Sequence, residues 1–334
     1  MQHSLEKAAD FVSAENSLSQ PTTTIDKTEG EQEIETLEGV DDEEANLIDG
    51  WNNCKKNPQH FNFIPVDQFT IKMLPQSHQN QDVYEYVKTV SSLTVLVAVA
   101  FTSPNRPTLR ADSKLHYSMH DDRKVKRYRK ASGTVVAVHH YHEPCWCSNC
   151  QSSDLPSQSR WELEVDTASH VVFDELEASH TKLTLFFDTR SSAKVTLSDV
   201  RLEASVDIEK DICRLCCVTC DKDLGAKLQG MFKRYLKLWD AVYSKYKRIR
   251  NACQLAIIVS HPHGCAKHIS LGKWVDKFQA EGYFKKFTYT TDTCPGSSGA
   301  LVNLIGFNKA WDANVHTGKD GPLNFSSCGY FTPI

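Results

Sequence analysis

The chain has 334 residues, of which 40% are hydrophobic and 24% charged, and its formal net charge is −4. This length allows one large domain or two barrels with appendages. The longest apolar run, residues 93–101, is too short to cross a bilayer, so we expect no membrane span. Twelve cysteines without an N-terminal signal peptide predict reduced thiols in a cytoplasmic or nuclear protein, not a disulfide scaffold.

The charge is unevenly distributed along the chain. Residues 1–50 hold fourteen acidic residues and two lysines, a net charge of −12, which leaves +8 for the remainder. These fifty residues are poor in aromatic side chains and rich in Glu, Asp, Ser and Thr. Because such a composition cannot bury enough apolar surface to fold, the sequence predicts a disordered acidic tail over residues 1–50.

An N-terminal extension is predicted over residues 51–90, with a short helix at 82–90 that leads into a buried strand at 93–101. The polar connection that follows contains a basic cluster at 123–130. Such a cluster can bind nucleic acid or an acidic partner. We favour a solvated loop or edge strand, because the cluster is short and the acidic tail of the same chain could pair with it.

A Cys-rich insertion is predicted at residues 139–160. Cys145, Cys147 and Cys150 have a spacing that brings three thiolates within reach of one ion, and three histidines lie in the six residues before Cys145. Three sulfurs and one imidazole satisfy tetrahedral Zn²⁺, so a structural zinc site is one hypothesis. Reduced surface thiols are the alternative.

Two segments in the middle of the chain carry candidate catalytic side chains. His170 follows the small residues Thr167, Ala168 and Ser169 and precedes two valines. A histidine held at a strand end by small neighbours can act as a general base, although a lone histidine is more often a surface or core residue. Asp211 opens an alternation of apolar and polar residues, where the ordinary interpretation is a turn residue at the start of a strand.

Four cysteines and a long periodic segment follow. Residues three apart in a strand point to opposite faces, so we interpret the cysteines as small core residues and not as a metal site; they are Cys213, Cys216, Cys217 and Cys220. Residues 225–251 carry apolar side chains at three- and four-residue steps with a basic opposite face, which predicts a helical insertion. Its aromatic stripe suits a packed face better than a nucleic-acid or membrane surface.

The most informative segment is 292–302, in which glycines flank a serine pair ahead of an apolar run. Gly296 allows a tight turn that aims backbone N–H groups at one point, and Ser298 then lies where its hydroxyl can attack. The N–H groups of Gly296 and Ser298 would bind the oxyanion that forms. Taken alone, Gly-Ser-Ser-Gly is more typical of an ordinary turn.

Together these segments resemble the trypsin-like serine peptidases of the chymotrypsin fold. His170, Asp211 and Ser298 come in the chymotrypsin order, and the resemblance covers residues from about 90 to 334. It implies a mostly β protein with two six-stranded barrels over residues 91–334. It also implies that the three residues form the triad of a serine endopeptidase that acts on a peptide or protein and needs no cofactor. The similarity looks greatest to uncharacterised intracellular animal members.

Two positions depart from the family pattern. Ser297 replaces the Asp that pairs with a new N-terminus after zymogen cleavage in trypsins, so we expect no such activation. Ala300 replaces a second glycine, as in bacterial-type members. The alternative function is a module that keeps the fold without cleaving and binds an acidic partner or nucleic acid. An intact triad favours the peptidase.

Two other positions give conflicting predictions for the residue before the cleaved bond. Asp292, six residues before Ser298, holds the place at the base of the trypsin pocket, where an acid would attract Lys or Arg. His316 holds the place at which glutamyl endopeptidase-like members receive Glu or Gln with an imidazole. We favour a basic substrate, because the sequence from Asp292 to Ser298 has no gap, whereas the alignment of His316 crosses a loop.

Overall fold

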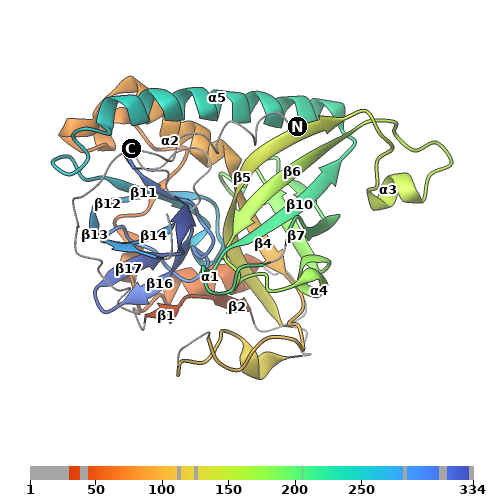
Figure 1. The fold of residues 1–334 in the computed structure, drawn as a ribbon, viewed down its shortest axis with the longest axis horizontal. Helices are drawn as coiled ribbons and strands as arrows, with labels where there is room; N and C mark the ends of the chain where they lie inside the picture. Colours follow the sequence, from red (N-terminus) through yellow and green to blue (C-terminus); the bar gives the residue numbers. More distant parts are fainter. Residues whose placement is uncertain are drawn as a thin grey trace, which may run out of the picture.

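A computed structural model of the chain describes residues 30–37, 44–110, 114–123, 127–204, 206–280, 284–307 and 314–330. In these residues most of the regular structure is antiparallel β-sheet, arranged as two halves that lie side by side (Figure 1). The first half uses strands between residues 94 and 219 and a short strand at 35–37. The second half uses strands between residues 256 and 330 and short strands at 31–32 and 64–65. This arrangement confirms the mostly β, chymotrypsin-like fold that the sequence predicts. The expected two six-stranded barrels within residues 91–334 are not seen as such, because the described strands form sheets of 8, 6 and 4 strands and three of the strands come from residues 31–65.

The first half is an 8-stranded sheet in the order β8-β7-β4-β5-β6-β10-β9, with β2 paired to β5. Val95, Val97 and Val99 on β4 are fully buried, as β-branched side chains on a central strand usually are. The strands are β2 (Glu35–Leu37), β4 (Thr94–Val99), β5 (Tyr128–Tyr141), β6 (Arg160–Thr167), β7 (Thr181–Leu185), β8 (Val195–Leu197), β9 (Val200–Leu202) and β10 (Cys213–Thr219).

The second half has two sheets, one in the order β1-β16-β17-β14-β13 with β18 beside β14, and one in the order β15-β11-β12-β3. Phe287, Tyr289 and Val302 belong to one buried apolar cluster that draws on both sheets. The strands are β1 (Glu31–Gln32), β3 (Ile64–Pro65), β11 (Ala256–Ser260), β12 (His268–Gly272), β13 (Trp274–Gln279), β14 (Phe284–Tyr289), β15 (Val302–Leu304), β16 (His316–Asp320), β17 (Leu323–Ser326) and β18 (Gly329–Tyr330).

Two long helices cover one side of the molecule. Helix α5 (Lys222–Tyr246) lies across both halves, with α2 (Gln81–Leu93) next to it (Figure 1). The rings of Tyr86 on α2 and Tyr235 on α5 stack with their centroids 5.7 Å apart. Asp221 accepts hydrogen bonds from the first backbone N–H groups of α5 and so begins the helix there. Both helices were predicted, with different ends.

The remaining helices are short. They are α1 (Glu44–Asn52), α3 (Ser148–Gln151), α4 (Glu175–Ala178) and the 3₁₀ turns η3 (Pro58–His60), η4 (Ile71–Met73), η5 (Gln76–His78), η6 (His120–Asp122) and η7 (Pro262–Gly264). Among the described residues, no helix combines the length and apolarity that a membrane crossing requires.

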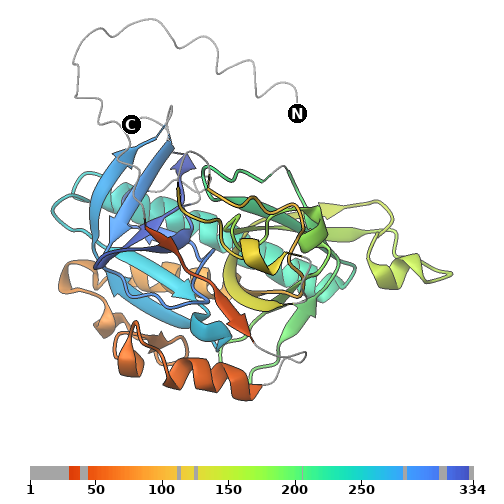
Figure 2. The same ribbon diagram turned by 90° about the horizontal axis from the view of Figure 1, so that it is seen from below.

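Part of the predicted disordered tail is ordered. Residues 1–29 and 38–43 lie outside the described residues, but residues 30–37 form β1 and β2. Figure 2 shows this stretch in red, running across the line where the two halves meet. The prediction of disorder is therefore wrong for residues 30–37, and also for residues 44–50, which belong to α1 (Glu44–Asn52). An acidic segment that cannot build its own core can still add to the edges of sheets that have already formed.

Candidate active site

Ser298 lies in the loop between β14 and β15, beside two glycines in the left-handed backbone region. Gly296 has a φ of +92° and Gly299 a φ of +82°. A Cβ on Gly296 would lie 2.6 Å from the carbonyl oxygen of His261, and one on Gly299 would collide with the backbone of Ser132. The loop therefore requires glycine at both positions, for its turn and for its close contacts.

His170 and Asp211 are brought together by the antiparallel pairing of β6 with β10. Nδ1 of His170 lies 2.8 Å from Oδ2 of Asp211. Oδ1 of Asp211 accepts hydrogen bonds from the backbone N–H of His170 and from the hydroxyl of Ser169. Burial raises the pKa of Asp211, but His170 and the hydrogen bonds outweigh it and hold that pKa below its ordinary value.

Ser298 and His170 meet at one atom, the carbonyl oxygen of Glu33. The Ser298 hydroxyl donates to this oxygen, and Nε2 of His170 lies 3.1 Å from it. The structure thus brings His170, Asp211 and Ser298 to one place. Within the described residues the backbone N–H groups of Gly296 and Ser298 have no hydrogen-bond partner, and their role as oxyanion donors stays a prediction.

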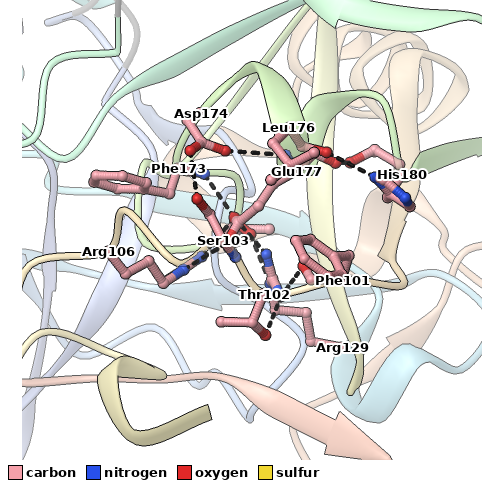
Figure 3. A network of polar contacts seen from close by, with 12 residues as sticks. Phe101, Thr102, Ser103, Arg106, Arg129, Phe173, Asp174, Leu176, Glu177 and His180 are labelled. Carbon is pink, nitrogen blue, oxygen red and sulfur yellow. Dashed lines mark hydrogen bonds and ion pairs between the residues drawn. The ribbon is translucent and has the colours of Figure 1, made fainter. Parts of the chain in front are cut away.

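A buried cluster of two arginines and one carboxylate holds the backbone around His170. Figure 3 shows the three side chains of this cluster, Arg106, Arg129 and Glu177. Glu177 accepts a hydrogen bond from Nε of Arg106 at 2.7 Å and another from Nη2 of Arg129 at 2.5 Å. Arg106 also donates to the carbonyl oxygen of His170 at 3.0 Å, and Arg129 donates to that of Val171 at 2.8 Å. These charge-assisted bonds fix the loop that follows β6.

The position of Arg129 shows that the basic cluster at 123–130 is not a solvated loop or edge strand throughout, as the sequence suggested. Residues 124–126 lie outside the described residues, but Arg129 lies on β5, between two neighbouring strands, and its side chain is fully buried. Burial lowers its pKa to about 10, and Glu177 supplies the opposing charge. A buried charge is tolerated only when it is paired, and the spacing in the sequence gives no sign of this partner.

Residues 30–37 cross the site with the pairing of a bound peptide. On one side β1 pairs antiparallel with β16, and the backbone N–H of Glu33 donates to the carbonyl oxygen of Thr317 at 3.1 Å. On the other side β2 pairs with β5, where Glu35 lies opposite Lys130. Extended peptides are commonly recognised by adding a strand to a sheet edge in this way.

The side chain of Glu33 is enclosed by groups that suit a carboxylate. Oε2 lies 2.9 Å from Nε2 of His316, and Oε1 lies 2.5 Å from Nζ of Lys56. The hydroxyls of Thr293 and Tyr289 complete the pocket, the first 3.3 Å from Oε2 of Glu33 and the second 2.7 Å from Nδ1 of His316. Burial raises the pKa of Glu33, but His316 and Lys56 outweigh it and lower the pKa to about 2.

Asp292 does not contact this carboxylate. Its Oδ2 accepts a hydrogen bond from Nδ2 of Asn62 at 2.7 Å, in an exposed position. Alternate residues of an extended stretch face opposite ways, so Thr293 turns toward Glu33 and Asp292 turns away. His316, the other candidate, contacts the carboxylate of Glu33 instead, and which of the two residues selects the substrate stays a prediction.

Sequence reasoning missed Lys56. Besides Glu33, its Nζ contacts the hydroxyl of Thr293 at 2.9 Å and Oδ1 of Asn324 at 2.8 Å. Burial lowers the pKa of His316, so Lys56 supplies the positive charge of the pocket at neutral pH. The resemblance to trypsin-like peptidases begins near residue 90, and no local pattern marks a lysine in the extension before it.

The Cys-rich insertion forms an arm that carries α3 and projects from the first half (Figure 1). The arm gathers four sulfur atoms within 4.8 Å of one another, those of Cys145, Cys147, Cys150 and Cys220. The fourth side chain of this cluster is therefore that of Cys220, where the sequence suggested a histidine. His140, one of the three nearby histidines, stacks on Trp161 instead. Because β10 ends at Thr219, Cys220 escapes the strand alternation that led us to place it in the core.

No family model matches the chain, and no curated protein matches it. Among solved structures, the HtrA-type protease AlgW with a tripeptide is similar at a TM-score of 0.37 and 12% identity, over 72% of this chain and 58% of that one. AlgW with a decapeptide is similar at a TM-score of 0.36 and 12% identity, over 72% of this chain and 62% of that one. Deg5 is similar at a TM-score of 0.38 and 10% identity, over 76% of this chain and 91% of that one. The chain thus spans less than two thirds of AlgW, and its fold assignment rests on its own strand order.

Proposed function

We propose that this chain is a serine endopeptidase that cleaves peptide bonds after Glu. The placement of Glu33 carries the proposal. Its carbonyl oxygen contacts Ser298 and His170, while its carboxylate contacts His316 and Lys56. One residue therefore connects a candidate nucleophile with a pocket for the side chain next to the scissile bond.

The proposed reaction follows the serine-peptidase scheme. Ser298 attacks the carbonyl carbon of a residue bound in the place of Glu33, and His170 takes the hydroxyl proton and returns it to the leaving amine. Asp211 orients the imidazole and stabilises the imidazolium. The N–H groups of Gly296 and Ser298 would stabilise the oxyanion, and water then hydrolyses the acyl-enzyme.

The charges of the pocket support a preference for Glu. Lys56 would repel a substrate Lys or Arg, and a neutral Gln would leave the lysine without its ion-pair partner. A substrate Glu satisfies Lys56, His316 and Thr293 together, as Glu33 does.

A fluorophosphonate probe tests the nucleophile. The full chain should be labelled at Ser298, and Ser298→Ala should lose the label and reduce peptide turnover by about 10⁴-fold or more. Because residues 30–37 cover the site, Glu33→Ala is assayed beside the parent. Ser297→Ala is the matched control, since Ser297 is equally buried and its hydroxyl lies 3.0 Å from that of Ser260. Loss of the label in Ser297→Ala alone would contradict the assignment.

A second function is binding of acidic peptides without cleavage. One observation favours it, because an acidic segment already fills the site from the same chain, with Glu33 on Lys56 and Glu35 on His263. Protein that binds such peptides but takes no label in the parent or in Glu33→Ala would support this function over the peptidase.

A further inference from the structure

A separate group of metal-binding side chains lies beside the nucleophile loop. Cys54, His60, His263 and Cys294 each place one ligand atom within 4.8 Å of the others, and all four residues are buried. The sulfur atoms of Cys54 and Cys294 are 3.5 Å apart. The four residues come from the N-terminal extension, from η7 and from the loop before Ser298.

Three of the four imidazole nitrogens in this group have no hydrogen-bond partner among the described residues. Nδ1 and Nε2 of His60 and Nε2 of His263 are buried without a hydrogen bond in the part of the chain that the structure describes. Buried polar atoms without partners are rare and costly, so they need an explanation. The ring of His60 is also held in place, because it stacks on Trp51 with the centroids 3.8 Å apart.

His263 is oriented as metal-binding histidines usually are. Its Nδ1 lies 2.9 Å from Oε2 of Glu35. A carboxylate on one ring nitrogen keeps the proton there and leaves the lone pair of Nε2 for a metal. The backbone N–H of His263 donates to the carbonyl oxygen of Pro295 at 2.7 Å, which ties this histidine to the nucleophile loop.

The two sulfurs receive hydrogen bonds from one residue. The backbone N–H of Asn57 donates to Sγ of Cys54 at 3.4 Å, and its side-chain Nδ2 donates to Sγ of Cys294 at 3.2 Å. Such donors favour thiolates, the form in which cysteine binds a metal. Two thiolates and two imidazoles are the closed tetrahedral set of a structural zinc site.

We propose that Cys54, His60, His263 and Cys294 bind one structural Zn²⁺. The ion would join the N-terminal extension to the nucleophile loop, because Lys56 follows Cys54 by two residues and Ser298 follows Cys294 by four. It would hold Lys56 in the pocket without touching the substrate. A Cys54–Cys294 disulfide is the competing state, but it would need the sulfurs to close to about 2 Å and would leave the histidine nitrogens unpartnered.

Elemental analysis of the full chain, purified without chelator, tests the proposal. Cys54→Ser should hold about one equivalent of zinc less than the parent, as one tetrahedral site requires. Cys253→Ser is the matched control, because this cysteine belongs to neither cluster and should leave the zinc content unchanged. Cys147→Ser separates any zinc held by the four-cysteine arm, so the two sites are counted independently.

A second readout covers the case in which Cys54→Ser fails to fold. Co²⁺ exchanged into the Cys147→Ser protein should give the visible absorption of tetrahedral cobalt with thiolate ligands. Three results would each overturn the proposal. The first is the absence of that absorption, and the second is a folded Cys54→Ser that holds as much zinc as the parent. The third is a Cys54–Cys294 disulfide found by mass spectrometry. Peptidase activity does not enter this test, so its presence or absence leaves the result unaffected.

Discussion

Glu177 is the residue on which the backbone around His170 depends. It is fully buried between Arg106 and Arg129, which in turn bind the carbonyl oxygens next to the histidine. Glu177→Gln keeps the shape of the side chain but leaves two buried arginines without their counter-charge. Breaking a buried pair in this way costs about 3–5 kcal/mol, so the free energy of unfolding in urea should fall by that order.

The matched control is Glu85→Gln, whose partner Arg234 is 59% exposed. Exposed pairs contribute about 0–1 kcal/mol, so this variant should unfold almost as the parent does. Equal losses of unfolding free energy in the two variants would show that the buried ion pairs of Glu177 stabilise the fold no more than the exposed pair of Glu85.

Glu33 makes the docking of residues 30–37 depend on pH. Its pKa falls from 4.5 to about 2 in the pocket. A carboxyl with a lowered pKa contributes stability that is fully present above its ordinary pKa and is lost as pH falls through the lowered one. Hydrogen exchange of the backbone N–H groups of 30–37 should therefore speed up, relative to Glu33→Gln, between about pH 5 and pH 2. Equal pH dependence in parent and variant would contradict this.

The sequence identified those site residues whose immediate neighbours form a recognisable local pattern. Small residues before His170 and glycines around Ser298 are visible in the sequence, and the structure brings both side chains together with Asp211. The sequence does not show that His316 faces Glu33 while Asp292 contacts Asn62, because this depends on which way each residue faces. That direction is set by the paired strands and not by the residue itself.

At the scale of elements, residues 30–37 cross the candidate site as an added strand, with the carbonyl oxygen of Glu33 against Ser298. If Ser298 is active, the Glu33–Ile34 bond should be cut by the chain itself. Acyl transfer to Ser298 breaks this C–N bond and releases Ile34 as a new N-terminus, and hydrolysis leaves Glu33 with a C-terminal carboxylate. Mass spectrometry of the incubated full chain should find both ends.

The variants separate this cleavage from other events. Ser298→Ala and Glu33→Ala should stay intact at this bond, whereas Glu31→Ala should be cut, because Glu31 is exposed and lies outside the pocket. A different outcome is an unmodified chain that cleaves added Glu peptides while its own Glu33–Ile34 bond stays intact. That result would disprove self-cleavage without contradicting the proposed peptidase function.

The four-cysteine arm is a second element with its own prediction. We propose that Cys145, Cys147, Cys150 and Cys220 bind Zn²⁺, because the arm has little core apart from these side chains. Cys147→Ser should increase proteolysis within residues 142–159 and leave peptide turnover close to that of the parent. Unchanged cleavage of the arm together with unchanged zinc content would contradict the site.

Elements with a strong local period were predictable, and those formed by docking were not. The apolar steps of α5 and α2 and the valine-rich β4 are visible in the sequence, although the ends of the helices are not. The strands β1 and β2 lie in an acidic segment and are ordered by their pairing with β16 and β5. Composition alone therefore predicted disorder where the rest of the fold supplies a partner.

At the scale of the whole molecule, the candidate site lies where the two halves meet. His170 and Asp211 belong to the first half, Ser298 and His316 to the second, and Lys56 to the extension. The order of three motifs predicted the two-part β fold, because each motif occupies a fixed place in it. The contribution of the extension depends on contacts between residues hundreds of positions apart, such as Cys54 with Cys294, which one sequence does not display.

The most direct measurement is kcat/KM for peptides that differ only in the residue before the cleaved bond. The Glu33→Ala chain, with its pocket free, should prefer Glu to Gln by about tenfold or more and should cleave Lys and Arg peptides at least about a hundredfold less well, because those would place a second cation beside Lys56. Ser298→Ala should cleave every peptide about 10⁴-fold less well or worse. Cleavage after Lys or Arg but not after Glu, or equal turnover in Ser298→Ala, would contradict the proposed peptidase.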